Sequence, residues 1–275
     1  MVDPALSRAT SITDNEFYLS SVRAALEDDE AFASCKQLAG IKGAVERLPE
    51  FRGAEYRDIV YRQTPGLLAY LEKFRENDSI GKPQLGMYPD GPMSPTTWRY
   101  VKVVSDLQML FRSLDGWHVA EIGVGYGGQC KILSDVYDVA SYTMYDLEPV
   151  IGLAQKYQRH LASRAADKVI AGDFRRLGSG EPRRYDLVIS NWALSECTRG
   201  IQDLYIEHVL RRSMHGYITY NQISDSRGID SYRKNEFIEA LGFPTELMEE
   251  GLNIPELPKE SENFILHWSG QPFLS

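Results

Sequence analysis

The hydrophobic pattern of the chain changes close to residue 117. Before this point, apolar residues recur at helical spacing, as in Leu67, Leu68, Leu71 and Phe74, with charged residues between them. After it, short apolar runs alternate with longer amphipathic stretches. Such alternation is typical of βαβ units, in which helices cover both faces of a mostly parallel sheet. We therefore expect an α/β fold preceded by a helical N-terminal extension.

The second part of the chain predicts a seven-stranded sheet. The strands are expected at 117–122, 141–146, 168–171, 185–190, 216–221, 245–249 and 263–268. The helices between them are expected near 126–137, 149–164, 200–212 and 233–241. No long helix separates the last two strands, so we expect the final strand to be antiparallel. A sheet of this kind binds its ligand beyond the carboxyl ends of the parallel strands.

Helices are also expected before the sheet, where segment 13–35 has helical periodicity. Residues 81–94 contain too many glycines and prolines for a long helix. Ser94 is a suitable N-cap and Pro95 a suitable first residue for a helix that runs to about Ser113. We assign 1–93 to a helical extension with a substrate-covering loop, and 94–275 to the domain that contains the sheet.

Composition excludes several classes of function. The 275 residues include 30 Lys and Arg against 39 Asp and Glu, and the net charge of −9 argues against a nonspecific nucleic-acid binder. The longest stretch without charged residues covers 263–275, which is shorter than the ~20 apolar residues of a membrane span. The N-terminus lacks the apolar core of a signal peptide, and the three cysteines form no CxxC pair. We expect a cytoplasmic protein that binds neither membrane nor nucleic acid, and the sequence leaves a homo-oligomer open.

The strongest local signal is the turn after the first strand of the sheet. Here Glu121-Ile-Gly123-Val-Gly125-Tyr126-Gly-Gly128 leads from a strand through glycines into a helix. Glycines permit positive φ angles and the close approach of a ligand. The turn does not match the P-loop pattern but partly fits G-x-G-x-x-G, so a nicotinamide-dependent oxidoreductase stays open. Glu121 would repel a pyrophosphate and suits a ligand with a cationic end, which favours a different cofactor.

Acidic residues follow the second and third strands. Asp146 lies about 20 residues after the glycine turn, where an acid accepts hydrogen bonds from a ribose. It can equally cap the helix that follows. Asp173, between Gly172 and Phe174, can accept from an adenine amino group while Phe174 packs on the ring, or it can be an ordinary turn residue.

These motifs occur in order at the ends of successive strands and are completed by the strand Tyr185-Asp-Leu-Val-Ile-Ser-Asn191. Together they resemble the motifs of class I S-adenosylmethionine (SAM)-dependent methyltransferases, over about residues 117–268. The resemblance implies a Rossmann-like sheet and SAM as the cofactor, with the glycine turn under its methionine part. It implies that Asp146 holds the ribose and Asp173 meets the adenine. The residues expected to bind the cofactor are Arg99, Glu121, Gly123, Gly125, Tyr126, Asp146, Leu147, Gly172, Asp173, Phe174 and Asn191.

A narrower resemblance extends into the region before the sheet. The segments Ser94-Pro-Thr-Thr-Trp-Arg-Tyr100, Ser190-Asn-Trp-Ala-Leu-Ser-Glu196 and Gly216-Tyr-Ile-Thr-Tyr-Asn221, with the glycine turn, are similar to sugar O-methyltransferases of bacterial natural-product and polysaccharide pathways. This similarity implies methyl transfer to a hydroxyl of a sugar or glycoside. A methyltransferase for another small molecule and a cofactor-binding protein without activity are the alternatives.

The acceptor is expected beyond the fourth and fifth strands of the sheet. An alcohol is a weak nucleophile at neutral pH, so a general base should assist. Glu196 is the nearest carboxylate, and it can act as the base, hold the cofactor or cap the next helix; His208 and Asp225 are further catalytic candidates. The five histidines show no metal-ligand spacing, so no metal site is assigned. The residues expected to contact the acceptor are Tyr88, Asp90, Trp192, Tyr220, Asn221 and Gln222.

Overall fold

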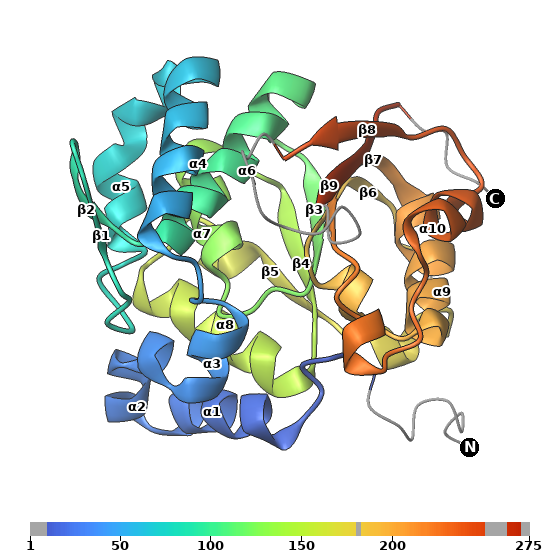
Figure 1. The fold of residues 1–275 in the computed structure, drawn as a ribbon, viewed down its shortest axis with the longest axis horizontal. Helices are drawn as coiled ribbons and strands as arrows, with labels where there is room; N and C mark the ends of the chain where they lie inside the picture. The colour runs from blue at the N-terminus through green and yellow to red at the C-terminus, as the bar shows by residue number, and fades with distance from the viewer. Residues whose placement is uncertain (1–9, 180–182, 251–262, 271–275) are drawn as a thin grey trace.

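The fold is built around one seven-stranded sheet (Figure 1). A computed structural model of the chain describes residues 10–179, 183–250 and 263–270. The strand order is β5-β4-β3-β6-β7-β9-β8. The strands are β3 (His118–Ile122), β4 (Ser141–Tyr145), β5 (Val169–Gly172), β6 (Tyr185–Asn191), β7 (Ser213–Tyr220), β8 (Glu246–Glu249) and β9 (Phe264–Trp268). β3 to β7 pair in parallel, whereas β9 is antiparallel to both neighbours. The predicted α/β class, the seven strands and the antiparallel last strand are confirmed.

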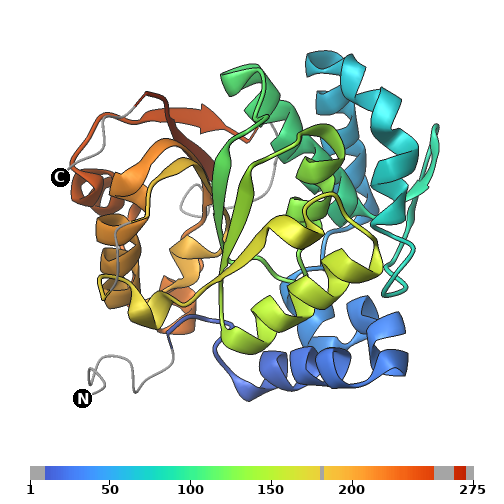
Figure 2. The same ribbon diagram turned by 180° about the vertical axis from the view of Figure 1, so that it is seen from behind.

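Helices cover both faces of the sheet, as its apolar strands require (Figure 1 and Figure 2). The first face carries α6 (Pro95–Phe111), α7 (Gly128–Val136) and α8 (Glu148–His160). The other carries α9 (Arg199–His208) and α10 (Lys234–Leu241). From β3 the chain proceeds to β4 on one side and later to β6 on the other, so the strand order reverses between β3 and β6. A ligand is expected at this reversal, beyond the carboxyl ends of these strands.

The N-terminal helices form a further layer outside the first face. In this layer α1 (Glu16–Glu27) lies along α8, while α4 (Glu50–Gln63) and α5 (Leu71–Glu76) pack on α6 and α7. Because α4 covers the side of α6 that faces away from the sheet, every residue from Pro95 to Leu107 except Arg99 is buried. Within the part of the chain that the structure describes, no helix is both long and apolar enough for a bilayer.

The helix expected at 13–35 is divided into α1, α2 (Asp29–Ala33) and a short 3-10 turn at Cys35–Gln37. The break lies at Asp28, whose backbone is extended and whose carboxylate accepts the Ala31 backbone N–H at 2.6 Å as the N-cap of α2. A third short helix, α3 (Ala39–Ala44), follows. A local cap thus overrides the continuous apolar periodicity.

The stretch rich in glycine and proline forms a hairpin of β1 (Gly86–Tyr88) and β2 (Gly91–Met93). Figure 1 shows it at the outer edge of the molecule, beside α5. Tyr88 donates a hydrogen bond to the Glu50 carbonyl at 3.2 Å, and Asp90 pairs with Arg57 at 2.6 Å. The hairpin is thus held against α4, and the expectation that this segment covers the substrate stays a prediction.

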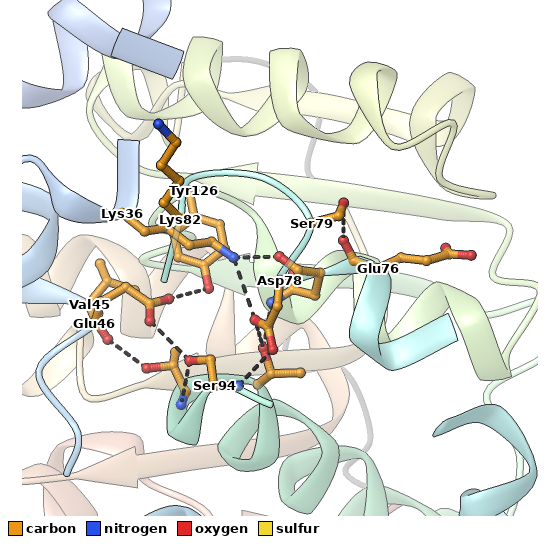
Figure 3. Close-up of polar contacts among 12 residues, drawn as sticks. Lys36, Val45, Glu46, Glu76, Asp78, Ser79, Lys82, Ser94 and Tyr126 are labelled. Carbon is orange, nitrogen blue, oxygen red and sulfur yellow. Dashed lines mark hydrogen bonds and ion pairs between the residues drawn. The ribbon is translucent and has the colours of Figure 1, made fainter. Parts of the chain in front are cut away.

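A buried ammonium group lies between the extension and the sheet domain. Lys36 has no exposed surface, and its ammonium group donates to the carbonyl of Asn77. It lies 3.8 Å from the Asp78 carboxylate and 4.6 Å from the centre of the Tyr126 ring (Figure 3). A buried charge of this kind is tolerated only where partners compensate the lost hydration.

Two carboxylates complete this Lys36 network (Figure 3). Asp78 accepts the backbone N–H of Ser94 at 2.7 Å. Glu46 accepts the hydroxyls of Tyr126 at 2.7 Å and Ser94 at 3.1 Å. Burial raises the pKa of Asp78, and the ammonium of Lys36 opposes that effect. The network therefore ties the extension both to the start of α6 and to the glycine turn.

We predict that Lys36→Met destabilises the fold by about 3–5 kcal/mol, because removal of one partner leaves the other charge buried without compensation. Urea unfolding of wild type and variant measures the difference. Lys42→Met is the matched control, since Lys42 is exposed on α3. Equal unfolding midpoints for the two variants would show that the network contributes no stability.

Candidate functional site

A cavity lies at the carboxyl ends of β3, β4 and β6, where the strand order reverses. Its walls come from the sheet, from α6 and α9, and from the N-terminal extension. The structure brings many of the predicted residues together here. Those that line it are Arg99, Glu121, Gly123, Gly125, Asp146, Leu147, Phe174, Asn191, Trp192 and Glu196.

The glycines of the turn after β3 line the cavity, allow close packing, or do both, as Gly123 does: a Cβ on it would lie 1.9 Å from the Cβ of Ala193. Gly123 and Gly125 line the cavity with φ of 80° and 53°. Gly127 (φ 90°) and Gly128 instead serve packing: a Cβ on Gly128 would lie 2.4 Å from the Tyr100 ring. Tyr126, predicted to bind cofactor, does not line the cavity, because its side chain is buried in the Lys36 network.

Glu121 is a buried carboxylate at the cavity wall, with 2% of its surface exposed. Burial raises its pKa to about 8, although a 2.7 Å hydrogen bond from the Tyr142 hydroxyl opposes the shift. At pH 7 the group is therefore mostly a neutral acid. A cation placed beside it would lower this pKa and draw off the proton.

Asp146 follows β4 and holds the glycine turn in place. One carboxylate oxygen accepts the Val124 backbone N–H at 2.8 Å, and the other accepts that of Leu147 at 2.8 Å. Burial raises its pKa to about 6, while these backbone hydrogen bonds act in the opposite direction. The expected helix cap is not formed, because Leu147 is the N-cap of α8 and no side chain caps this helix. Each carboxylate oxygen of Asp146 retains a second lone pair, so its bonds to the backbone are compatible with binding a ribose.

Two buried donors at the cavity have no partner among the described residues. They are Nε of Arg99 and the indole N–H of Trp192. The guanidinium carbon of Arg99 lies over the Trp192 indole, 4.6 Å from the centre of the ring. Trp192 itself has a φ of 61°, a conformation that non-glycine residues seldom adopt. Because unsatisfied buried donors cost free energy, their placement here indicates a ligand that supplies an acceptor.

Glu196 lies at the cavity beside Asn221, whose amide donates to its carboxylate at 3.2 Å. Burial raises the pKa of Glu196. The hydrogen bond from Asn221 and the charges of Arg47, Arg227 and Arg99 lower it. A carboxylate with a raised pKa next to a cavity is a reasonable general base. The structure also removes one alternative, because Thr198, not Glu196, is the N-cap of α9.

The far end of the cavity is apolar and aromatic. Leu147 and Phe174, both predicted, meet Ile201 and Tyr205 of α9, which the sequence analysis missed. Phe174 and Tyr205 are both buried, with ring centres 6.4 Å apart. A flat apolar group such as a nucleobase suits these walls.

The N-terminal segment covers the cavity, a role that no local motif predicts. Thr10, Ser11 and Thr13 line it. The backbone N–H of Ile12 donates to the carbonyl of Glu196 at 3.1 Å, and that of Thr198 donates to the Thr10 carbonyl at 3.0 Å. The extension contributes four further lining residues, Tyr18, Ala44, Val45 and Arg47.

Gly172, Asp173 and His208 lie on a second cavity, on the other side of Tyr145. The Asp173 carboxylate accepts the backbone N–H of Arg175 at 3.0 Å, as in the turn alternative. The structure thus does not bring this aspartate into the first cavity. It also separates His208 from Glu196, so a shared catalytic role is not supported.

Several predicted acceptor residues lie away from the first cavity. Tyr88 and Asp90 are on the hairpin bound to α4. Tyr220 is fully buried between Phe237 and Phe264, with ring centres at 4.9 and 5.3 Å. Because both faces of β7 are buried at this end, alternation along the strand does not indicate which side chains reach the cavity.

Three further predicted residues follow β7 in the chain. Neither Asn221 nor Gln222 lines the cavity, but Asn221 donates a hydrogen bond to Glu196, which does. Asp225 begins a 3-10 turn at Asp225–Arg227, and its side chain is outside what the structure describes. Among described residues, no group of three or more His, Cys, Asp and Glu side chains could hold a metal ion.

No protein-family model and no characterised protein matches the sequence. Solved structures resemble the fold. A SAM-dependent methyltransferase from Clostridium acetobutylicum is 9% identical, with a TM-score of 0.48 over 62% of this chain and 89% of that one. A magnesium protoporphyrin IX methyltransferase from Synechocystis, solved with bound SAM, is 17% identical, with a TM-score of 0.44 over 78% of this chain and 95% of that one. Similarity this low carries no conclusion about activity.

We predict that Glu121 makes stability fall as pH rises. Its pKa is near 4.5 in an unfolded chain and about 8 in the fold. Between these values the folded state binds more protons, so the stabilisation present below pH 4.5 is lost as pH approaches 8. Melting temperatures of wild type and Glu121→Gln should therefore diverge from pH 5 to 8 in favour of the variant. The exposed Glu239→Gln is the control; a constant difference for Glu121→Gln would contradict the assigned pKa.

Proposed function

We propose that the protein is a SAM-dependent methyltransferase whose acceptor is a sugar hydroxyl. The observation that carries the proposal is one cavity with three matching features. These are an acid for a cationic end (Glu121), an acid beside a glycine turn for a ribose (Asp146), and unpartnered donors on Arg99 and Trp192. An amino acid joined to a nucleoside presents this set of groups.

We assign each group of SAM to residues that line the cavity. Glu121 would receive its ammonium group, and the unpartnered Nε of Arg99 its carboxylate. Gly123 and Gly125 leave room for the chain between them, and Asp146 would accept from the ribose hydroxyls. Phe174 and its apolar neighbours would enclose the adenine. When bound, the cofactor supplies a methyl group on a sulfonium, which is open to displacement by a nucleophile.

The acceptor is proposed to lie between Glu196, Trp192 and Asn221. The acceptor oxygen would form a bond to the methyl carbon as the carbon–sulfur bond breaks and its electron pair stays on sulfur. Glu196 would take the hydroxyl proton, for which its raised pKa is suitable. The Trp192 ring lines the cavity and is the kind of group that stacks on a sugar, while the Asn221 amide holds the Glu196 carboxylate through a hydrogen bond.

We predict that S-adenosylhomocysteine binds and raises the melting temperature, because a ligand selective for the folded state stabilises it. Asp146→Ala should weaken this binding about tenfold to a hundredfold, the equivalent of losing a charged hydrogen bond of roughly 1.5–3 kcal/mol. Calorimetric titration measures both. The exposed Asp167→Ala should bind as wild type does. No binding by the wild type at millimolar ligand would refute the proposal.

Glu196→Gln should leave the fold and cofactor affinity largely intact and lower turnover by about 10²–10⁴-fold, because the amide cannot accept the proton. Turnover with a panel of sugar and non-sugar alcohols and the dissociation constant for S-adenosylhomocysteine are to be measured together. Weaker cofactor binding with normal turnover at saturation would instead assign Glu196 to holding the cofactor. Turnover with the non-sugar alcohols alone would refute the sugar acceptor but not methyl transfer.

A further inference from the structure

A second cavity lies beside the ends of β4 and β5, separated from the first by Tyr145, which lines both. Its volume is about 450 Å³, within the roughly 300–1,000 Å³ typical of small-molecule sites. Gly172 and Asp173 form one wall and His208 another. Nothing in the proposed methyl transfer uses this space.

Three arginines line this cavity and have no side-chain partner among the described residues. They are Arg176, Arg183 and Arg212. None makes a side-chain hydrogen bond or ion pair with another described residue, and Nε of Arg212 is buried and unsatisfied. By contrast, Arg211, next in the chain to Arg212, pairs with Glu207 at 2.7 Å.

Three arginine side chains at one cavity are electrostatically unfavourable unless an anion binds between them. Like charges that converge on one cavity repel each other. The acidic chain has many carboxylates, yet among the described residues that line this cavity the single carboxylate is Asp173, so the charges of these lining residues sum to +2 with three arginines. Guanidinium groups present paired N–H donors that match the oxygens of phosphate.

We propose that this second cavity binds a phosphorylated small molecule, with a phosphate or diphosphate ester of charge near −2 held by Arg176, Arg183 and Arg212. The site differs from the methyl-transfer cavity, since none of these arginines lines the latter. The inference stands whether or not the proposed function is correct.

Calorimetric titration of the full chain with inorganic phosphate, pyrophosphate and uridine diphosphate tests the proposal. Binding at low ionic strength should weaken as salt is added. Arg176→Gln/Arg183→Gln should lower the affinity at least about tenfold, because two charged hydrogen-bonding groups are lost. Both residues are exposed, so the fold should persist. Arg23→Gln/Arg52→Gln, which removes two guanidiniums away from the cavity, is the matched control.

The three probes also distinguish between two sources of the phosphate group, a free anion and a nucleotide. Equal affinity for pyrophosphate and uridine diphosphate would indicate a free anion as the ligand, and a preference for uridine diphosphate would indicate a nucleotide. No binding by any probe, or equal affinity of both double variants, would overturn the proposal. Loss of S-adenosylhomocysteine affinity in Arg176→Gln/Arg183→Gln would overturn it too, since the cavity would then belong to the cofactor site.

Discussion

The compensation of one buried charge organises the N-terminal half of the molecule. Lys36 is removed completely from water, and a charge in that position needs nearby acceptors. Asp78, the Asn77 carbonyl and the Tyr126 ring provide them, and Glu46 completes the network through Tyr126. Val45 and Arg47, on either side of Glu46 in the chain, line the cavity. The network that neutralises Lys36 thus also fixes part of the site.

In the first cavity, burial favours the protonated forms of the carboxylates. The pKa of Glu121 is raised to about 8 and that of Asp146 to about 6, and that of Glu196 is raised as well. In each case burial outweighs hydrogen bonds or positive charges that act in the opposite direction. A site of this kind responds to a cationic ligand, because the ligand restores the ionised form that burial disfavours.

Glycine and arginine show how one residue type serves two purposes in this fold. Gly123 and Gly125 face the cavity, whereas Gly127 and Gly128 allow α7 to pack against its neighbours. The number of glycines in the turn is therefore larger than the number that line the cavity. Some arginines pair with carboxylates, as Arg57 does with Asp90, but three that line the second cavity form no ion pair with any described residue. Composition and spacing alone do not distinguish these uses, since the difference lies in what each group meets across space.

The sequence alone determined the sheet, its antiparallel last strand and the acids and glycines at the ends of β3 and β4, because apolar periodicity and turn residues are local properties. It also placed Glu196 and Trp192 at the cavity, since parallel strands end at one edge. Only the tertiary structure decided that the N-terminal segment covers the cavity, that the hairpin with Tyr88 and Asp90 binds α4, and that Tyr220 points into the core. These outcomes depend on contacts between residues far apart in the chain, which the hydrophobic periodicity of a single segment does not predict.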